Sequence, residues 1–219
     1  MSTTTTLRSN SRETLSHDAT RLVLAAHPQR IADVLDPRLS TAVVGRLQGC
    51  PRLHGRIAQL LMQPSTGDSN DMPAGGDLAD PQATFERLFR ADLKQASALA
   101  GAAWHASSLR QMIRGRDVAD LVAQIGHRAH AFGLRRAGAA PALNSITPGA
   151  LAERIARDGD ACLVIWFSSF PPSMRQQLHV RLPPASAGAP EWSDAQRSLA
   201  LDLIDPVLSE LDESLNVSE

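Results

Sequence analysis

Apolar residues recur every three or four positions through most of the chain, as they do along one face of an α-helix. The longest such series lies between Arg116 and Gly133 and predicts one continuous helix. Its apolar members are Val118, Leu121, Val122, Ile125, Ala129 and Phe132. A second series consists of Phe85, Leu88, Phe89, Leu93, Ala96 and Leu99. The segment ASALAGAAWHAS then adds small side chains that let helices pack closely, so the pattern predicts a mainly α-helical, multi-helix globular protein.

Capping signals divide this pattern into separate helices. Three of them place a capping side chain before a proline at the first helical position: Asp36-Pro37, Asp80-Pro81 and Thr147-Pro148. Ser193 and Gln196 have the spacing of a capping box. These signals predict helices that begin near positions 37, 81, 148 and 194. Two more helices, with weaker capping signals, are predicted at 14–26 and 52–62.

One short segment has the period of a β-strand instead. Leu178, Val180 and Leu182 alternate with polar residues, which predicts a short strand or hairpin near 177–182. An apolar run precedes it, and we expect its large side chains Trp166, Phe167 and Phe170 to share one core with the strand. The run from 161 to 167 is much shorter than the roughly 20 residues that span a membrane.

Polar segments separate the helical regions. Residues 1–13 predict a disordered tail, and residues 64–80, rich in Gly, Ser, Asn and Asp, predict a flexible linker. The sequence therefore predicts an N-terminal helical segment at 14–63 and a main helical domain at 81–215.

Composition narrows the class of protein. The chain has 219 residues, of which 43% are hydrophobic, and its formal net charge is −1. Such a charge gives no general attraction to nucleic acid or anionic lipid. The N-terminus lacks the apolar segment of a secretory signal, and Cys50 and Cys162 lie far apart with no metal-binding spacing. We expect a cytoplasmic protein with reduced cysteines.

Charge is distributed unevenly along the chain. From 86 to 136, nine basic residues face four acidic ones, a net charge of +5, whereas the segment from 191 onward carries −7. The two segments form an ordinary solvated surface, pair with each other, or provide docking faces for other proteins. The candidate docking residues are Arg114, Arg116, Arg128, Arg135, Arg136, Asp202, Asp205, Glu210, Asp212 and Glu213.

The sequence contains no convergent set of catalytic groups. His127 and His130 have a spacing compatible with a metal, but no third ligand lies within reach on their helix. Cys50 and His54 lack any supporting motif, and no phosphate-binding loop, nucleophile elbow or zinc-protease motif is present. We expect no enzyme activity, no metal and no cofactor, although an enzyme with dispersed catalytic residues stays a third possibility.

A DNA-binding or regulatory protein is the main alternative. The segment around Gly126, followed by Arg128, Arg135 and Arg136, loosely suggests a helix-turn-helix. The continuous apolar stripe favours a single helix instead, in which Gly126 costs about 1 kcal/mol relative to Ala.

The C-terminal third has a more specific pattern. Trp166 stands in a short apolar helix that leads through Pro171 and Pro172 to a Leu-x-apolar-x-Leu-Pro segment, here Leu178, Val180, Leu182 and Pro183. Trp192 follows, and then Gln196, Arg197, Leu199 and Ala200 open the next helix. Over 147–211 this pattern resembles the K component of bacterial type III secretion systems, the SctK or YscK family, in its plant-pathogen-type version.

The resemblance implies a function. Members of that family are cytoplasmic, non-enzymatic adaptors of the sorting platform, peripheral at the inner membrane through the secretion complex. They join the inner-membrane ring protein SctD to SctQ and SctL, and so indirectly to the ATPase SctN. No cofactor, nucleic acid or direct membrane contact is implied.

Overall fold

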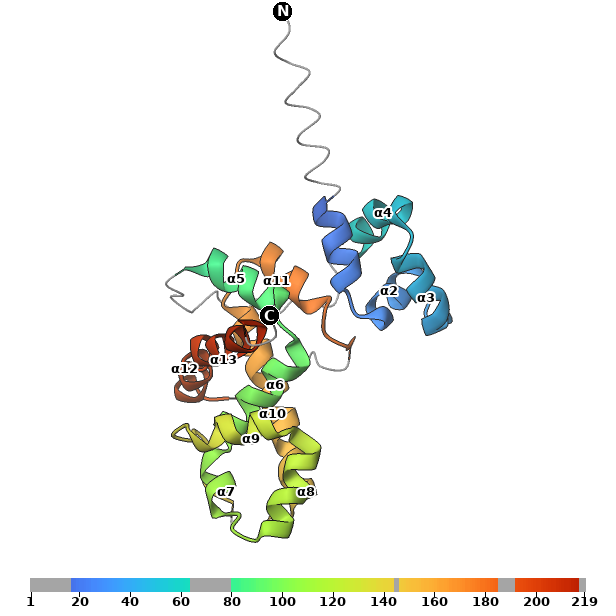
Figure 1. Ribbon diagram of the computed structural model, residues 1–219. Coiled ribbons are helices and arrows are strands. Elements are labelled where there is room, and N and C mark those ends of the chain that lie inside the picture. The colour runs from blue at the N-terminus through green and yellow to red at the C-terminus, as the bar shows by residue number, and fades with distance from the viewer. Residues whose placement is uncertain (1–16, 64–79, 144–145, 185–191, 217–219) are drawn as a thin grey trace, which may run out of the picture. The chain divides into compact units, whose positions relative to one another are not determined.

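The computed structural model of the chain describes residues 17–63, 80–143, 146–184 and 192–216 (Figure 1). Regular secondary structure in these ranges is helical, which confirms the predicted mainly α fold. A first helix, described over residues 17–25, precedes α2 (Pro28–Leu35), α3 (Thr41–Gln48), α4 (Pro51–Leu61), α5 (Pro81–Arg90), α6 (Leu93–Trp104), α7 (Ala106–Gln111), α8 (Gly115–Ile125), α9 (His127–Leu134), α10 (Pro148–Ser168), α11 (Pro172–His179), α12 (Asp194–Leu201) and α13 (Ile204–Asn216).

The chain forms two compact units. Unit 1 comprises Met1–Asp71 and Pro172–Ala185, and unit 2 comprises Met72–Pro171 and Ser186–Glu219. This division differs from the predicted one, because α11 belongs with the N-terminal helices and not with the domain predicted at 81–215. The predicted tail at 1–13 and nearly all of the predicted linker at 64–80 lie outside the described residues.

Unit 1 is held by side chains that bind exposed helix ends. Gln48 donates to the carbonyls of Val23 and Ala26, both at 3.0 Å, and so satisfies the C-terminal end of the first helix. Buried His54 joins the Thr20 hydroxyl, at 3.1 Å, to the Gln48 carbonyl, at 2.7 Å. These bonds fix α3 and α4 against the first helix.

The strand predicted at 177–182 is absent, and α11 continues into a tight turn instead. The amide of Val180 donates to the Gln176 carbonyl, and the amide of Leu182 donates to the His179 carbonyl. Because these donors find acceptors three or four residues back, the segment needs no partner strand. Leu178, Val180 and Leu182 are buried, but in unit 1. Trp166, Phe167 and Phe170 are buried as predicted and belong to unit 2.

Unit 2 is built on the close packing of α6 and α10. A side chain at Gly101 of α6 would overlap the backbone carbonyl of Ile155, and one at Gly159 of α10 would overlap that of Ser97. Gly133 lets α9 approach α6 in the same way, next to the Ala102 carbonyl. The small residues of α6 thus permit the close packing that the sequence predicted.

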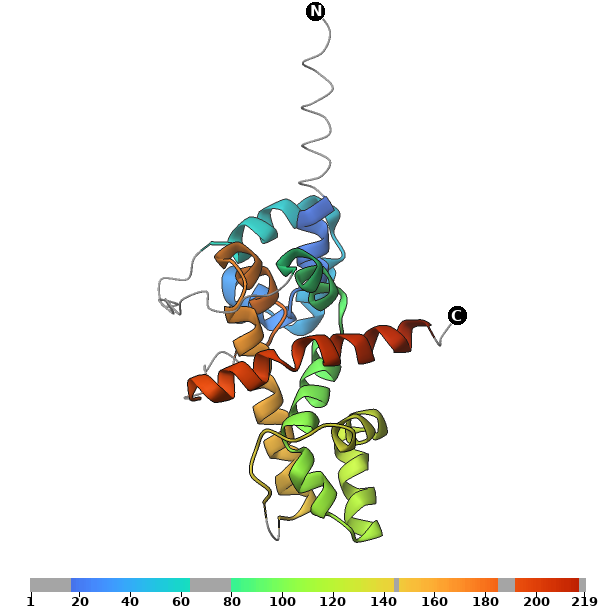
Figure 2. The ribbon, with the colours of Figure 1, turned by 90° about the vertical axis from the view of Figure 1, so that its left-hand side faces the viewer.

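The two C-terminal helices lie across this pair. Figure 2 shows α12 and α13, in red, following one another across α10 and α6. The buried indole of Trp166 donates a 2.6 Å hydrogen bond to the Ala200 carbonyl of α12. Trp192, just before α12, stacks on Trp104 at the end of α6, with 4.3 Å between ring centroids. Aromatic contacts therefore attach α12 to both central helices.

The helix starts predicted near 81, 148 and 194 are confirmed. Asp80 accepts from the Ala83 amide, Thr147 from the Ala150 amide, and Ser193 forms the predicted capping box with Gln196. The start predicted near 37 is wrong, because Asp36 ends α2 and its carboxylate binds Arg38. The helices predicted at 14–26 and 52–62 correspond to the first helix and to α4.

The single helix predicted at 116–133 is also wrong. Gly126 separates α8 from α9 with a φ of 87°. Only glycine adopts that conformation without strain, so its backbone freedom breaks the helix although the apolar stripe continues on both sides.

Candidate docking surfaces

The basic and acidic segments of unit 2 meet each other. Arg87 of α5 binds Asp212 of α13 at 2.8 Å and lies 3.7 Å from Asp205. Glu210 lies between two arginines, 3.6 Å from Arg128 of α9 and 2.7 Å from Arg135, which follows the last residue of α9. The Arg128 guanidinium also donates to the backbone carbonyl of Glu210.

These pairs give five of the candidate docking residues an intramolecular role. Glu210 is largely buried between its partners, with 16% of its side chain exposed. Arg136 lies over the Phe132 ring, 4.6 Å from its centroid, so it too has a partner within the unit. The opposite charges of the two segments therefore hold α13 against α9 and α5.

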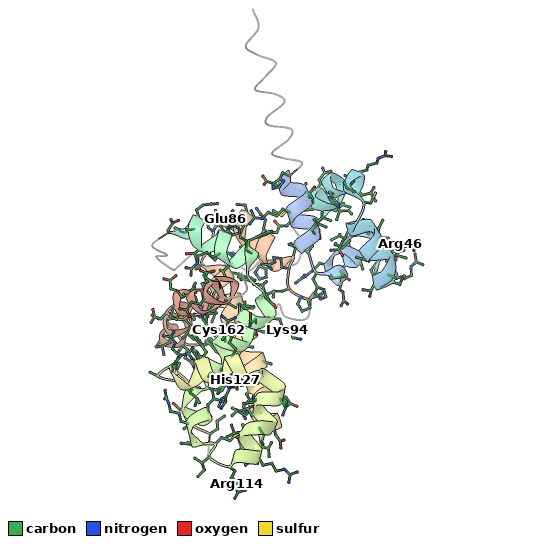
Figure 3. The ribbon with its side chains drawn as sticks, in the orientation of Figure 1. Arg46, Glu86, Lys94, Arg114, His127 and Cys162 are labelled. Carbon is green, nitrogen blue, oxygen red and sulfur yellow. The ribbon has the colours of Figure 1, made fainter. Side chains whose placement is uncertain are left out.

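Arg114 and Arg116 differ from the other candidate arginines. Both are exposed, at the start of α8, and no ion pair holds either one within the part of the chain that the structure describes. Arg114 lies in the connection between α7 and α8, as Figure 3 shows. Beside it, Ile113 is 87% exposed, an apolar side chain that the periodicity of the sequence did not single out. Asp202 and Glu213 of the acidic segment are also exposed.

The motif that resembles the K component is divided between the two units. Trp166 and Trp192 hold α12 in unit 2, as described above. In unit 1, the Val180 carbonyl accepts from the His27 amide at 2.8 Å, and the Leu182 carbonyl accepts from Arg30 at 3.2 Å. Pro183 follows directly. The motif thus contributes packing to both units.

The buried polar groups of unit 2 form a structural network. The His105 ring nitrogen donates to the Asp158 carboxylate at 2.7 Å, and Ser97 donates to Asp160 at 2.7 Å, each pair joining α10 to the region of α6. Burial opposes ionisation of Asp158, but hydrogen bonds from His105 and Arg157 outweigh it and lower its pKa. Burial, with a smaller contribution from the Asp158 charge, raises the pKa of the Cys162 thiol, so this cysteine is a poor nucleophile.

The histidines singled out in the sequence lie at the start of α9. His127 is exposed, and desolvation followed by the charge of His127 lowers the pKa of His130. Among the described residues, no three His, Cys, Asp or Glu side chains come together as a metal site would require. A search of the same residues finds no helix with the length and apolar character of a membrane span.

Comparison with known proteins identifies relatives. Nodulation protein NolU of Sinorhizobium fredii (strain NBRC 101917 / NGR234) is 42% identical over 190 residues, which cover 84% of this chain and 85% of the relative. Nodulation protein NolU of Rhizobium fredii matches with the same identity and coverage. The chain belongs to the NolU family. Because 84% of the chain exceeds either unit alone, the similarity to NolU extends into both units.

Two further comparisons give no match. No protein-family model matches the NolU-like sequence, and no solved structure matches it. Membership of the NolU family thus rests on sequence identity over most of both chains.

Proposed function

We propose that the chain is a non-enzymatic adaptor of a bacterial type III secretion system. In this proposal it joins the inner-membrane ring protein SctD to SctQ and SctL, and through them to the ATPase SctN. It acts in the cytoplasm and reaches the inner membrane only through the secretion complex. It needs no cofactor.

The division of one sequence motif between two compact units carries this proposal. Trp166 and Trp192 build unit 2, whereas Leu178, Val180 and Leu182 build unit 1. A bridging protein needs two separate surfaces, and two units with their own cores can supply one each. The relatives are called nodulation proteins, and export of proteins toward a host is compatible with that name.

The pairing of charges in unit 2 makes the DNA-binding alternative less attractive. A recognition helix at α9 would present Arg128 and Arg135 to phosphates or bases. Both arginines bind Glu210 instead, and a DNA contact would have to break those pairs. An electrophoretic shift on random duplex at low salt would detect that alternative directly.

Deletion of the gene tests the proposal in the cell. With SctD and SctQ carrying different fluorescent labels, we expect SctD foci to persist at the envelope and SctQ foci to become diffuse. Export of secreted proteins should stop, and a plasmid copy should restore both export and SctQ foci. Persistence of SctQ foci together with normal export would contradict the proposal.

A further inference from the structure

The exposed sides of α3 and α4 in unit 1 carry arginines and no acid. Arg46, Arg52 and Arg56 are all exposed there, and the sequence has no Asp or Glu between Asp36 and Asp68. No ion pair joins these three arginines to an acid within the described residues. Figure 3 shows Arg46 on the outer side of α3. In contrast to Arg87 of α5 and Arg128 of α9, these charges are not paired with an acid among the residues that the structure describes.

On α4 the basic residues form one stripe. Arg52, Gly55, Arg56 and Gln59 occupy positions i, i+3, i+4 and i+7 and are all exposed. The opposite side of α4 carries the buried residues His54, Ile57, Ala58 and Leu61. The stripe is therefore the face of α4 that the core of unit 1 leaves uncovered.

Two exposed glycines, one on α3 and one on α4, have no packing partner. A side chain at Gly45 of α3 or at Gly55 of α4 would meet no atom within 4 Å. Glycine inside a helix is unfavourable relative to alanine. In unit 2, the glycines at 101, 133 and 159 each admit a neighbouring helix or backbone. Gly45 and Gly55 carry the same cost in helix stability, but neither one admits a neighbouring helix.

We propose that the exposed sides of α3 and α4, with Arg46, Arg52, Arg56, Gly45 and Gly55, together form one face that docks an acidic helix of a partner protein. The uncompensated arginines select an acidic surface, and the two glycines leave room for its backbone to come close. The acids of this chain's own α13 are a poorer match, because Asp205, Glu210 and Asp212 already bind arginines of unit 2. A membrane is disfavoured because residues 17–63 contain no Trp, Tyr or Phe to anchor in an interface.

The test measures binding of the full-length chain to purified SctQ and, separately, to the purified cytoplasmic domain of SctD. The choice of these two proteins rests on the proposed function. The triple variant Arg46→Glu, Arg52→Glu, Arg56→Glu should bind one of them about tenfold or more weakly at low salt. The variant Lys94→Glu, Arg154→Glu is a matched control, since it reverses exposed charges of unit 2 that are not among the candidate docking residues. It should leave the affinity for that same protein unchanged.

A second variant separates docking from folding. Gly55→Gln should raise the melting temperature, because glutamine is a better helix former, and should weaken binding to the same partner about tenfold or more. Lower stability would instead show that Gly55 serves the fold of unit 1. Unchanged affinity would show that no backbone approaches it, and either result would overturn the inference.

The remaining outcomes are distinguishable. If the wild-type chain binds neither SctQ nor SctD, the proposed function fails first. If it binds them and the triple variant binds both equally well, the inference fails while the proposed function stands. Sedimentation of the wild-type chain with phosphatidylglycerol vesicles, lost in the triple variant, would assign the face to a membrane. Dimers seen by light scattering for the wild type but not for the triple variant would assign it to a second copy. Either result would also overturn the inference.

Discussion

The indole nitrogen of Trp166 donates to the backbone carbonyl of Ala200 at 2.6 Å, in the buried interior of unit 2. This bond joins α10 to α12 across 34 residues of sequence and directs the chain toward α13. The stack of Trp192 on Trp104 attaches the same segment to α6. Placement of the C-terminal helices therefore depends on two tryptophans, both part of the motif that resembles the K-component family.

Removal of Trp166 should weaken the core strongly. Trp166→Ala empties a fully buried aromatic site, and we expect a loss of about 3–5 kcal/mol in the free energy of unfolding. Trp166→Phe keeps most of the volume and loses the hydrogen bond, so we expect about 1–2 kcal/mol. Urea denaturation measures both, and an unchanged midpoint for the alanine variant would show that Trp166 is not part of the core.

A side chain at Gly101 or Gly159 should disrupt the packing of α6 against α10. In Gly101→Val the new atoms would overlap the Ile155 backbone, so the helices must separate, at a cost of about 3 kcal/mol or more. Gly45→Val is a suitable control, because a side chain there meets open space and valine is an acceptable helix residue. Thermal melting of both variants checks the contact, and equal melting temperatures would argue against it.

Ionised Asp158 should stabilise unit 2 in a defined pH range. Its pKa in the folded protein lies below the ordinary value of about 3.9, so its contribution is fully present above that value and is lost as the pH falls through the folded pKa. Asp158→Asn should therefore lower the melting temperature at pH 7 and narrow its difference from wild type near pH 3. Melting curves from pH 3 to pH 7 provide the measurement, and a difference that grows toward acid pH would contradict the assignment.

Glu210 should matter for folding, and Arg114 for binding alone. Glu210→Ala removes the partner of two arginines and should lower the free energy of unfolding by about 1–2 kcal/mol. The loss should be smaller at high salt, because salt screens the ion pairs. Arg114→Glu changes an exposed side chain and should stay within about 0.5 kcal/mol of wild type. Chemical denaturation at low and high salt compares them. Equal effects of the two changes would show that the Glu210 pairs contribute nothing to stability.

The sequence predicted those features of the fold that depend on interactions between residues close together in the chain. The caps at Asp80, Thr147 and Ser193 each accept from the amide three residues further on, so the sequence alone identifies those helix starts. The alternation at 178–182 was misleading, because a turn after a helix can bury every second residue as a strand does.

Other features depend on contacts between distant segments. The pairing of Arg87 with Asp212 spans 125 residues, and charge counts could only suggest that the two segments meet. The docking role of Arg114 and Arg116 stays a prediction, as do the absence of enzyme activity, metal and cofactor. The break at Gly126 shows that an unbroken apolar stripe does not exclude a change of helix axis.

Bridging is the central claim, and a reconstituted three-protein assay tests it most directly. The cytoplasmic domain of SctD is immobilised, and purified SctQ, with SctL where SctQ requires it, is passed over it with or without this chain. The account predicts that SctQ is retained only when the chain is present, in proportion to the amount of chain bound. Retention of SctQ without the chain, or displacement of the chain from SctD by SctQ, would contradict it.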